Sequence, residues 1–320
     1  MDILQTLESE SINCCVTSPP YYGLRDYGVD GQIGLEETLE EYIDRLIMVF
    51  KEVRRILKKD GTLWLNMGDT YCSTAPGTMG DPYFIKECRE ETNNARKRYR
   101  GLTPQGMKPK DLMGVPWMLA FALRADGWYL RQDIIWAKPN PMPESVKDRC
   151  TKSHEYIFLF SKSKRYYFDY ETIKEPCVGF NNYPPAGSKG TIKPNQRLRK
   201  GNDKTFRGGG VYTNNRSFDN SAAAEKTSIG NKPNESGLRN KRDVWTVATR
   251  GYKGAHFATF PPELIKPCIL AGCPINGTVI DSFLGSGTVG EVALMNDRDF
   301  IGIELNPDYC EIARVRTNGA

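Results

Sequence analysis

The sequence predicts an α/β fold with a doubly wound, mostly parallel sheet, and three observations support this. Short apolar runs typical of buried strands alternate with amphipathic helical segments along the chain. The run Ile12 to Val16 ends in T-S-P-P-Y (Thr17 to Tyr21), where prolines stop a strand. The run Thr278 to Asp281 leads into a turn with Gly285 and Gly287, and a helix opens directly afterwards. Strands and helices in this order indicate a sheet with helices on both faces.

The other elements follow from local patterns. Apolar residues recur with helical spacing from Leu39 to Leu57, and Lys59-Asp60-Gly61 is expected to end that helix and turn into a strand at Thr62 to Asn66. Prolines typical of a first helical turn favour three further helices. We expect these helices over 116–124, 262–271 and 307–316, and strands over 128–138, 155–161 and 299–304. The strand over 155–161 is expected to be the antiparallel neighbour of the strand over 128–138.

Length and composition restrict the class of protein. With 320 residues, the chain can form one large α/β domain with an insertion, or two small domains. It has no run of 18 apolar residues and no charged-then-apolar leader at Met1, so we expect a cytosolic protein without a membrane segment. The nine cysteines lack C-x-x-C pairing and the two histidines lie far apart, so we expect no metal site and reduced thiols.

The T-S-P-P-Y motif has the chemistry to hold an exocyclic amine. Pro19 and Pro20 fix φ and have no N–H, so the backbone is stiff and its carbonyls point outward. The Ser18 hydroxyl beside a rigid carbonyl can accept hydrogen bonds from an amine, while the flat ring of Tyr21 stacks on the base that carries it. The alternative is a strand that ends in a proline turn without further function.

The second motif has the pattern D-x-F-x-G-x-G-T and indicates a nucleotide-like cofactor. Gly285 and Gly287 permit a tight turn and close approach of a ligand to the free N–H groups of the next helix. Glu304 ends the following strand about 20 residues later, where an acid can accept hydrogen bonds from both ribose hydroxyls. Phe283, an apolar ring after a strand, could equally be a core residue.

With T-S-P-P-Y first and D-x-F-x-G-x-G-T last, the chain resembles the beta group of amino-methylating DNA methyltransferases. That family transfers a methyl group from S-adenosylmethionine to N4 of cytosine or N6 of adenine. Segments 66–69, 136–140 and 155–160 also resemble the family. The resemblance implies a Rossmann-like S-adenosylmethionine-dependent methyltransferase fold, with a seven-stranded sheet that has one antiparallel strand. It also implies a catalytic half (1–170, with a flexible loop at 72–110), a target recognition region (171–243) and a cofactor-binding half of the same domain (244–320).

The resemblance also assigns roles to individual residues. The cofactor is expected to contact Thr17, Thr259, Phe260, Asp281, Phe283, Gly285, Gly287, Thr288 and Glu304. Asp2 matches the acid that bonds the adenine, although the strand that precedes this acid in the family would fall before Met1. A base must be flipped out of the duplex to reach the cofactor. Ser18 and the Pro19 carbonyl would then draw the amine towards tetrahedral geometry for attack on the methyl group, with Tyr21, or in reserve Tyr22, stacking on the base.

Two irregular stretches are expected to contact DNA. Residues 171–243 contain 14 Lys/Arg and 7 Asp/Glu, and are rich in Gly, Asn, Ser and Pro. Their composition also fits a disordered linker, but their place between the two halves favours target recognition. The residues expected to contact phosphates or bases are Asn195, Gln196, Arg197, Arg199, Arg207, Asn214, Asn215 and Arg216. In the loop 72–110, the cluster Arg96, Lys97, Arg98 and Arg100 either contacts phosphates or is a solvated basic patch.

The product is expected to be N4-methylcytosine in duplex DNA. The reason is that Ser18 stands where adenine enzymes more often have an aspartate. N6-adenine methylation remains the alternative. A non-catalytic DNA- or cofactor-binding protein is a minor alternative. Carbon-5 methylation needs a Pro-Cys nucleophile, whereas Cys273-Pro274 has the reverse order, so Cys273 is interpreted as a core residue. We expect the protein to act in a prokaryotic or phage-infected cell, with a cognate restriction endonuclease as a partner. Its oligomeric state is expected to be a monomer or a homodimer.

Overall fold

The computed structural model describes residues 2–24, 26–72, 104, 106–176, 237–249 and 260–318. The chain divides into two compact units, one formed by Met1–Ile173 with Arg242–Ala320 and the other by Lys174–Lys241. In the second unit, β5 (Glu175–Pro176) pairs antiparallel with β6 (Leu238–Arg239), and the Arg239 Nε donates a 2.9 Å hydrogen bond to Glu175.

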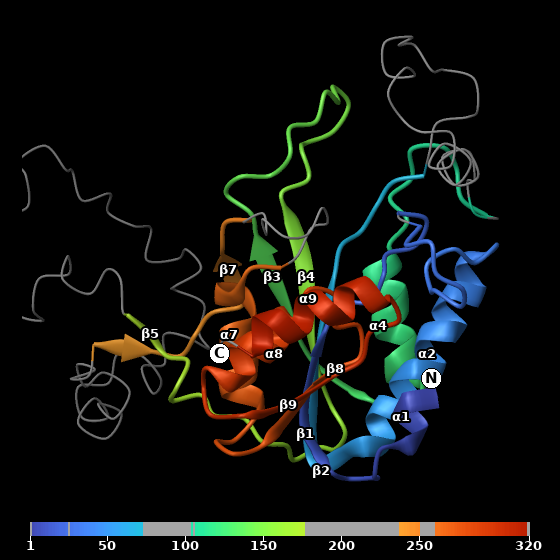
Figure 1. The fold of residues 1–320 in the computed structure, drawn as a ribbon. Coiled ribbons are helices and arrows are strands. Elements are labelled where there is room, and N and C mark those ends of the chain that lie inside the picture. Colours follow the sequence, from blue (N-terminus) through green and yellow to red (C-terminus); the bar gives the residue numbers. More distant parts are fainter. Residues whose placement is uncertain are drawn as a thin grey trace, which may run out of the picture. The chain divides into compact units, whose positions relative to one another are not determined.

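The first unit is built on a seven-stranded sheet with the order β7-β3-β4-β2-β1-β8-β9 (Figure 1). Its strands are β1 (Ile12–Thr17), β2 (Leu57–Met67), β3 (Tyr129–Ala137), β4 (His154–Ser161), β7 (Val244–Thr246), β8 (Thr278–Asp281) and β9 (Asp299–Gly302). Strand β4 runs antiparallel to both β2 and β3, and the other described pairings in this sheet are parallel. The expected seven-stranded, mostly parallel sheet with one antiparallel strand is therefore confirmed, as is the antiparallel pairing of β3 with β4.

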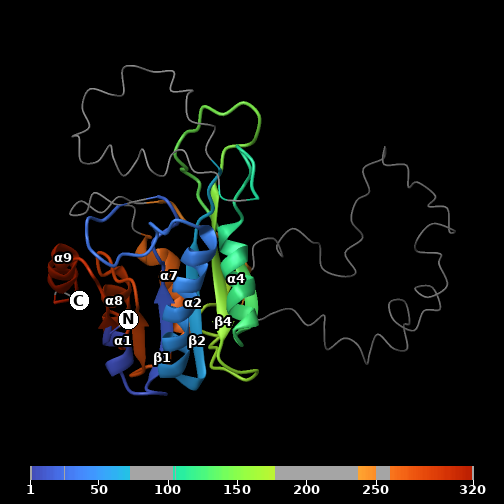
Figure 2. The ribbon, with the colours of Figure 1, turned by 90° about the vertical axis from the view of Figure 1, so that its right-hand side faces the viewer.

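Alternating side chains of the strands supply two separate cores. Cys15 of β1 packs in one cluster with α2 (Leu39–Ile56) and α4 (Val115–Ala125), which face the viewer in Figure 2. Cys14 and Val16 belong to the other cluster, together with α7 (Pro262–Gly272) and α8 (Thr288–Leu294). Because successive side chains point to opposite faces, a strand buried on both faces needs apolar residues throughout. In the run from Ile12 to Val16, every residue except Asn13 meets that need.

The helices begin where the sequence provides caps. Thr38 accepts a hydrogen bond from the Glu41 N–H and the Glu41 side chain accepts from Thr38, a complete capping box for α2. Asn306 caps α9 (Pro307–Thr317) with its side chain. The expected helices agree with α2, α4, α7, α8 and α9 to within one or two residues at their ends. A short helix, α1 (Asp2–Thr6), precedes β1 and packs on α2. Among the residues that the structure describes, none of the helices combines the length and apolar character needed to cross a bilayer.

The turn expected at Lys59-Asp60-Gly61 does not separate α2 from the strand; the segment forms an irregularity within β2. Strand β2 starts directly after α2 at Leu57, and its register against β1 shifts between Ile12 and Cys14. A Cβ at Gly61 would lie 3.0 Å from the Leu57 Cβ, so the chain folds tightly back on itself here. The glycine therefore accommodates an irregularity within a strand.

Candidate active site

The T-S-P-P-Y motif leaves the carboxyl end of β1 as a turn fixed to α2. The Tyr42 hydroxyl of α2 donates a 2.8 Å hydrogen bond to the Pro20 carbonyl, and Tyr42 itself is fully buried. Tyr22 is 7% exposed and packs its ring 5.4 Å from that of Tyr42, so it belongs to the core. Ser18 and Tyr21 are only half-buried. Of the two tyrosines, Tyr21 is thus the one whose ring lies at the edge of the sheet.

The two sequence motifs meet at one hydrogen bond. Strand β1 pairs with β8, and beyond that pairing Thr17 Oγ1 donates a 2.5 Å hydrogen bond to Asp281 Oδ1. The Phe283 N–H donates to the same oxygen at 3.0 Å. Strand order reverses between β1 and β8, because β2 lies on one side and β9 on the other. In open α/β sheets, ligands bind at the carboxyl ends of the strands at such a reversal.

Asp281 has an unusual electrostatic environment. Burial raises the pKa of its carboxyl to about 7, with the hydrogen bonds from Thr17 and the Phe283 N–H opposing this and Glu304 adding to it. Its second oxygen, Oδ2, is buried and has no hydrogen-bond partner among the described residues. A buried unpaired oxygen is costly. The atom therefore fits a donor brought by a ligand, above all a cationic amine.

The two glycines of the turn have different tasks. A Cβ at Gly287 (φ +81°) would lie 2.9 Å from the Ala313 Cα, so this glycine lets α9 pack against the turn. A Cβ at Gly285 (φ +54°) would meet only the Phe283 carbonyl oxygen, at 4.0 Å. Gly285 thus leaves space for a ligand. Glu304 closes the turn, since its Oε2 accepts a 2.8 Å hydrogen bond from the Gly285 N–H.

Two further predicted cofactor residues, Thr288 and Phe283, belong to this turn, and a third, Phe260, packs against a core cluster. Thr288 is buried and its hydroxyl accepts a 2.7 Å hydrogen bond from Arg316 of α9, so it stabilises the turn from behind. Phe283 is half-buried, with its ring 6.5 Å from that of Phe50 of α2. Phe260 is half-buried against the second core cluster. Phe283 therefore packs on the core, as the alternative interpretation expected, and also lies in the turn. Cys273 is fully buried, as expected for a core residue.

The remaining predicted residues lie apart from this edge or outside the described chain. Asp2 is exposed at the first residue of α1, which is bound to the end of α2 through Arg55 and the Leu4 carbonyl. Thr259 of the expected cofactor site is outside the described residues. So are the expected DNA-contacting residues Arg96, Lys97, Arg98, Arg100, Asn195, Gln196, Arg197, Arg199, Arg207, Asn214, Asn215 and Arg216.

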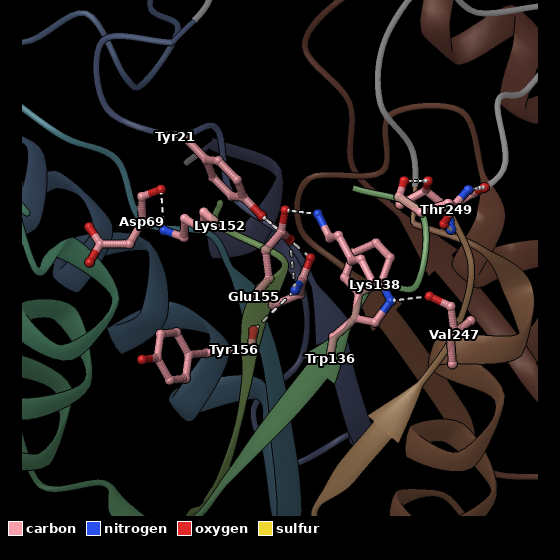
Figure 3. A network of polar contacts seen from close by, with 11 residues as sticks. Tyr21, Asp69, Trp136, Lys138, Lys152, Glu155, Tyr156, Val247 and Thr249 are labelled. Carbon is pink, nitrogen blue, oxygen red and sulfur yellow. Dashed lines mark hydrogen bonds and ion pairs between the residues drawn. The ribbon is translucent and has the colours of Figure 1, made fainter. Parts of the chain in front are cut away.

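The sequence interpretation missed a polar network beside Tyr21 (Figure 3). The Tyr21 hydroxyl donates a 2.9 Å hydrogen bond to Glu155 Oε2 on β4, and Lys138 forms an ion pair with the other carboxylate oxygen. Burial and the Glu155 carboxylate raise the pKa of Tyr21 well above its usual value, while the Ser18 side chain opposes this. One signal was available in the sequence: a glutamate at the head of the apolar strand 155–161, next to the sheet edge that carries the motifs.

Asp69 ties the end of β2 to α4 in the same region. Its carboxylate accepts hydrogen bonds from the N–H groups of Thr70, Gly114 and Val115 at 2.9–3.2 Å. Gly114 is the N-cap residue of α4 and has no side chain, so Asp69 caps the helix from a distant part of the sequence. Lys152 Nζ donates to the Asp69 carbonyl at 2.5 Å, and its own pKa is lowered by burial.

Comparison with known proteins agrees with this geometry. Residues 12–315 match the model of a family described as DNA methylase (N6/N4). The type II methyltransferase M.Cfr9I of Citrobacter freundii is 44% identical over 320 residues, covering 100% of this chain and 85% of that protein. Type II methyltransferase M.SmaI of Serratia marcescens is 45% identical over 316 residues, covering 98% of this chain and 87% of that protein.

The fold is shared with solved structures. The PvuII DNA methyltransferase (cytosine-N4-specific) aligns with a TM-score of 0.58 at 18% identity, covering 98% of this chain and 82% of that one. At these identities the likeness shows the fold. The family match over almost the whole chain shows more: this protein belongs to the amino-methylating N6/N4 DNA methylases, which take their methyl group from S-adenosylmethionine.

Proposed function

We propose that this chain is a type II modification methyltransferase that transfers a methyl group to N4 of a flipped-out cytosine in double-stranded DNA. The observation that carries the proposal is the Thr17–Asp281 hydrogen bond, because it brings the T-S-P-P-Y turn and the glycine turn to one point of the sheet edge. A reaction between a base amine and a nucleotide-like cofactor needs the two binding elements side by side. The full-length similarity to type II methyltransferases supports the same assignment.

Asp281, Gly285 and Glu304 are the residues proposed to hold S-adenosylmethionine, which supplies the sulfonium-bound methyl group. The unpaired Asp281 Oδ2 fits the amino group of its methionine part. The open space at Gly285 permits close approach to the turn. Glu304 is held at the turn by the N–H groups of Gly285 and Asn306. Its Oε1 accepts from both Leu305 and Asn306, whereas Oε2 accepts from Gly285 and can accept a further bond from a ribose hydroxyl.

Ser18, Pro19, Pro20 and Tyr21 are the residues proposed to present the amine. A base amine is a poor nucleophile because its lone pair is delocalised into the ring. Hydrogen bonds to the Ser18 hydroxyl and the Pro19 carbonyl would favour tetrahedral nitrogen and free that pair. The prolines and the Tyr42–Pro20 bond keep these acceptors rigid, so little reorganisation accompanies the reaction. Tyr21 would stack on the base, at roughly 1–3 kcal/mol for such contacts.

Cytosine is favoured over adenine because the acceptor heading the turn is a neutral hydroxyl. The carboxylate closest to Tyr21, that of Glu155, is already engaged by the Tyr21 hydroxyl and Lys138. N6-adenine methylation remains the second candidate, since the same acceptors could hold an adenine amine. Cys273 precedes Pro274, the reverse of the Pro-Cys order of a cysteine nucleophile, and Cys273 is buried. Both facts argue against carbon-5 methylation.

We further propose that residues 171–243 read the DNA sequence and that a restriction endonuclease of the same specificity accompanies the enzyme in a bacterial or phage-infected cell. The excess of 14 Lys/Arg over 7 Asp/Glu in this stretch supports DNA contact. The type II names of the relatives support the restriction partner.

Nucleoside mass spectrometry tests the proposed product. Unmethylated bacterial DNA is incubated with the protein and S-adenosylmethionine, digested to nucleosides, and compared with standards by mass and retention time. We expect N4-methylcytosine, and no methylated nucleoside from the matched Asp281→Ala variant. N6-methyladenine as sole product would overturn the cytosine assignment and leave the amine mechanism standing. 5-Methylcytosine would overturn both.

A further inference from the structure

Glu155 is a largely buried carboxylate at the edge of the sheet where the two motifs meet. It lies near the start of the antiparallel strand β4, and its side chain is 16% exposed. One oxygen is paired with Lys138, and the other lies 2.9 Å from the Tyr21 Oη and 3.4 Å from Asn66 Nδ2. Burial of a carboxylate is unfavourable unless such partners compensate. The proposed reaction has so far assigned this group no role.

Lys138, which pairs with Glu155, is also in contact with the ring of Trp136 (Figure 3). Its ammonium lies 4.2 Å from the centroid of the Trp136 ring, and the Trp136 indole donates a 2.8 Å hydrogen bond to the Val247 carbonyl. A cation over an indole face is attracted to it. In its ion pair with this lysine, the Glu155 carboxylate has oxygens that accept hydrogen bonds. The Tyr21 hydroxyl must donate to it.

Tyr21 is restrained at both ends of its side chain. At the backbone, the preceding Pro20 carbonyl is bonded to Tyr42. At the ring tip, the hydroxyl is bonded to Glu155. Gly68 makes room for this arrangement, since a Cβ there would lie 2.8 Å from Tyr21 Cε2 and 3.2 Å from Glu155 Cδ. The two bonds fix the axis that runs from Tyr21 Cβ to Oη, and the close packing of Cε2 at Gly68 restricts rotation of the ring about that axis.

We propose that Glu155, supported by Lys138, is a positioning residue for methyl transfer: it holds in place the Tyr21 ring on which the target base stacks. The proposal rests on the proposed function, because it requires Tyr21 to be the stacking ring. A base that is displaced by about 1 Å from the methyl group can react on the order of 100-fold more slowly. Without its hydroxyl anchor, the Tyr21 ring is free to swing about the Cα–Cβ bond, and the stacked base would move with it.

The test compares Glu155→Gln, Tyr21→Phe and the double variant, with labelled S-adenosylmethionine and unmethylated bacterial DNA as substrates. We expect each single variant to lower kcat by about 10-fold to 100-fold, with cofactor affinity by calorimetry and melting temperature close to wild type. The double variant should be no slower than the slower single variant, because both changes remove the same hydrogen bond. Glu52→Gln is the matched control: this partly buried glutamate pairs with Arg55 at 2.7 Å on α2, and we expect it to leave kcat unchanged.

A kcat of Tyr21→Phe equal to that of the wild type would overturn the proposal. So would a double variant whose loss of kcat is the product of the losses in the two single variants. A fall in kcat accompanied by equal losses of cofactor affinity and melting temperature would also overturn it, since that pattern reports a structural role. Should Glu155→Gln fail to fold, Tyr21→Phe decides alone, because it leaves the Lys138–Glu155 pair intact. Failure of the proposed function can be distinguished from failure of this proposal. If Tyr21 were not the stacking ring, Tyr21→Ala would retain turnover.

Discussion

Thr17 and Asp281 are 264 residues apart in the chain and share a 2.5 Å hydrogen bond inside the sheet. Thr17 is fully buried and Asp281 is 1% exposed. A hydroxyl next to a buried carboxylate stabilises its ionised form, which burial alone would disfavour. The contact therefore controls the charge of Asp281 as well as joining the two turns of the active site.

Cofactor binding should depend on pH through Asp281. Its pKa in the folded protein, about 7, lies above the ordinary 3.8. Without cofactor, the folded state holds an extra proton between these values, so stability should fall as pH rises from about 4 to 7. An amino group needs the ionised carboxylate, so affinity should weaken about tenfold per pH unit below about 7. Above about 8 it should weaken again as the amine loses its proton.

Calorimetry of S-adenosylmethionine binding from pH 5.5 to 8.5 measures both limbs of this profile. Asp281→Asn should remove the acidic limb only. Thr17→Val should move the acidic limb to higher pH, because it deletes a hydrogen bond that favours the ionised carboxyl. An affinity that stays constant between pH 5.5 and 7 in the wild type would contradict the assignment of Asp281 to the amino group.

Gly285 and Gly287 form a matched pair that separates binding from folding. Both have positive φ, so alanine is strained at both positions. At Gly287 the new methyl group would also lie 2.9 Å from the Ala313 Cα, whereas at Gly285 the space is open. We expect Gly287→Ala to lower the melting temperature more than Gly285→Ala does. Gly285→Ala should chiefly weaken cofactor affinity, which calorimetry measures. The reverse ranking would show that the ligand approaches the turn elsewhere.

Tyr21 and Tyr22 form a second matched pair. Tyr21→Ala should reduce kcat strongly and leave cofactor affinity nearly unchanged, because the ring is proposed to contact the base. Tyr22→Ala removes a 7%-exposed core ring and should cost about 3–5 kcal/mol of stability, as other buried aromatic truncations do. Steady-state methylation, calorimetry and urea unfolding distinguish the two. Loss of cofactor binding in Tyr21→Ala would mean that the ring faces the cofactor.

The sequence predicted most of the fold because its buried strand segments are mostly apolar and its helices have local start signals. The run Ile12 to Val16 and the cap at Thr38 are examples. It placed the start of β2 too late, at Thr62, because Leu57 already pairs with Ile12 and the Lys59-Asp60-Gly61 segment lies in the irregularity before Thr62 meets Cys14. Local patterns contain no information about such tertiary pairing.

For the site, motif residues could be located from the sequence, but their partners could not. Glu155 lies on β4 and Lys138 directly follows β3, both distant in sequence from Tyr21, and Asp69 caps a helix that begins 46 residues later. The contacts of Glu155 depend on strand order, because β4 must lie between β3 and β2 before these side chains can meet. Tyr22 is a motif neighbour whose role the sequence left open, and only its packing on Tyr42 assigns it to the core.

Asp69 should be required for the stability of α4. It provides the only side-chain cap among the described contacts at the start of this helix, where Gly114 has none to offer. Asp69→Ala should lower the free energy of unfolding by about 1–2 kcal/mol. Asp69→Asn keeps one acceptor oxygen and should lose less. Urea unfolding followed by circular dichroism measures both, and equal stability of Asp69→Ala and wild type would show that the cap is dispensable.

Residues 171–243 should determine which DNA sequence is methylated. Their surplus of positive charge, their richness in Asn and Gly and their place between the two halves of the sheet domain in sequence motivate this. The catalytic and cofactor motifs lie outside the stretch, at 17–21 and 281–288. Replacing it with the corresponding stretch of a type II relative should therefore change the methylated sequence and preserve methyl transfer. Sequencing that detects modified bases in the treated DNA identifies the site. A chimera that still methylates the original sequence would move specificity elsewhere, with the basic segment 96–100 the next to replace.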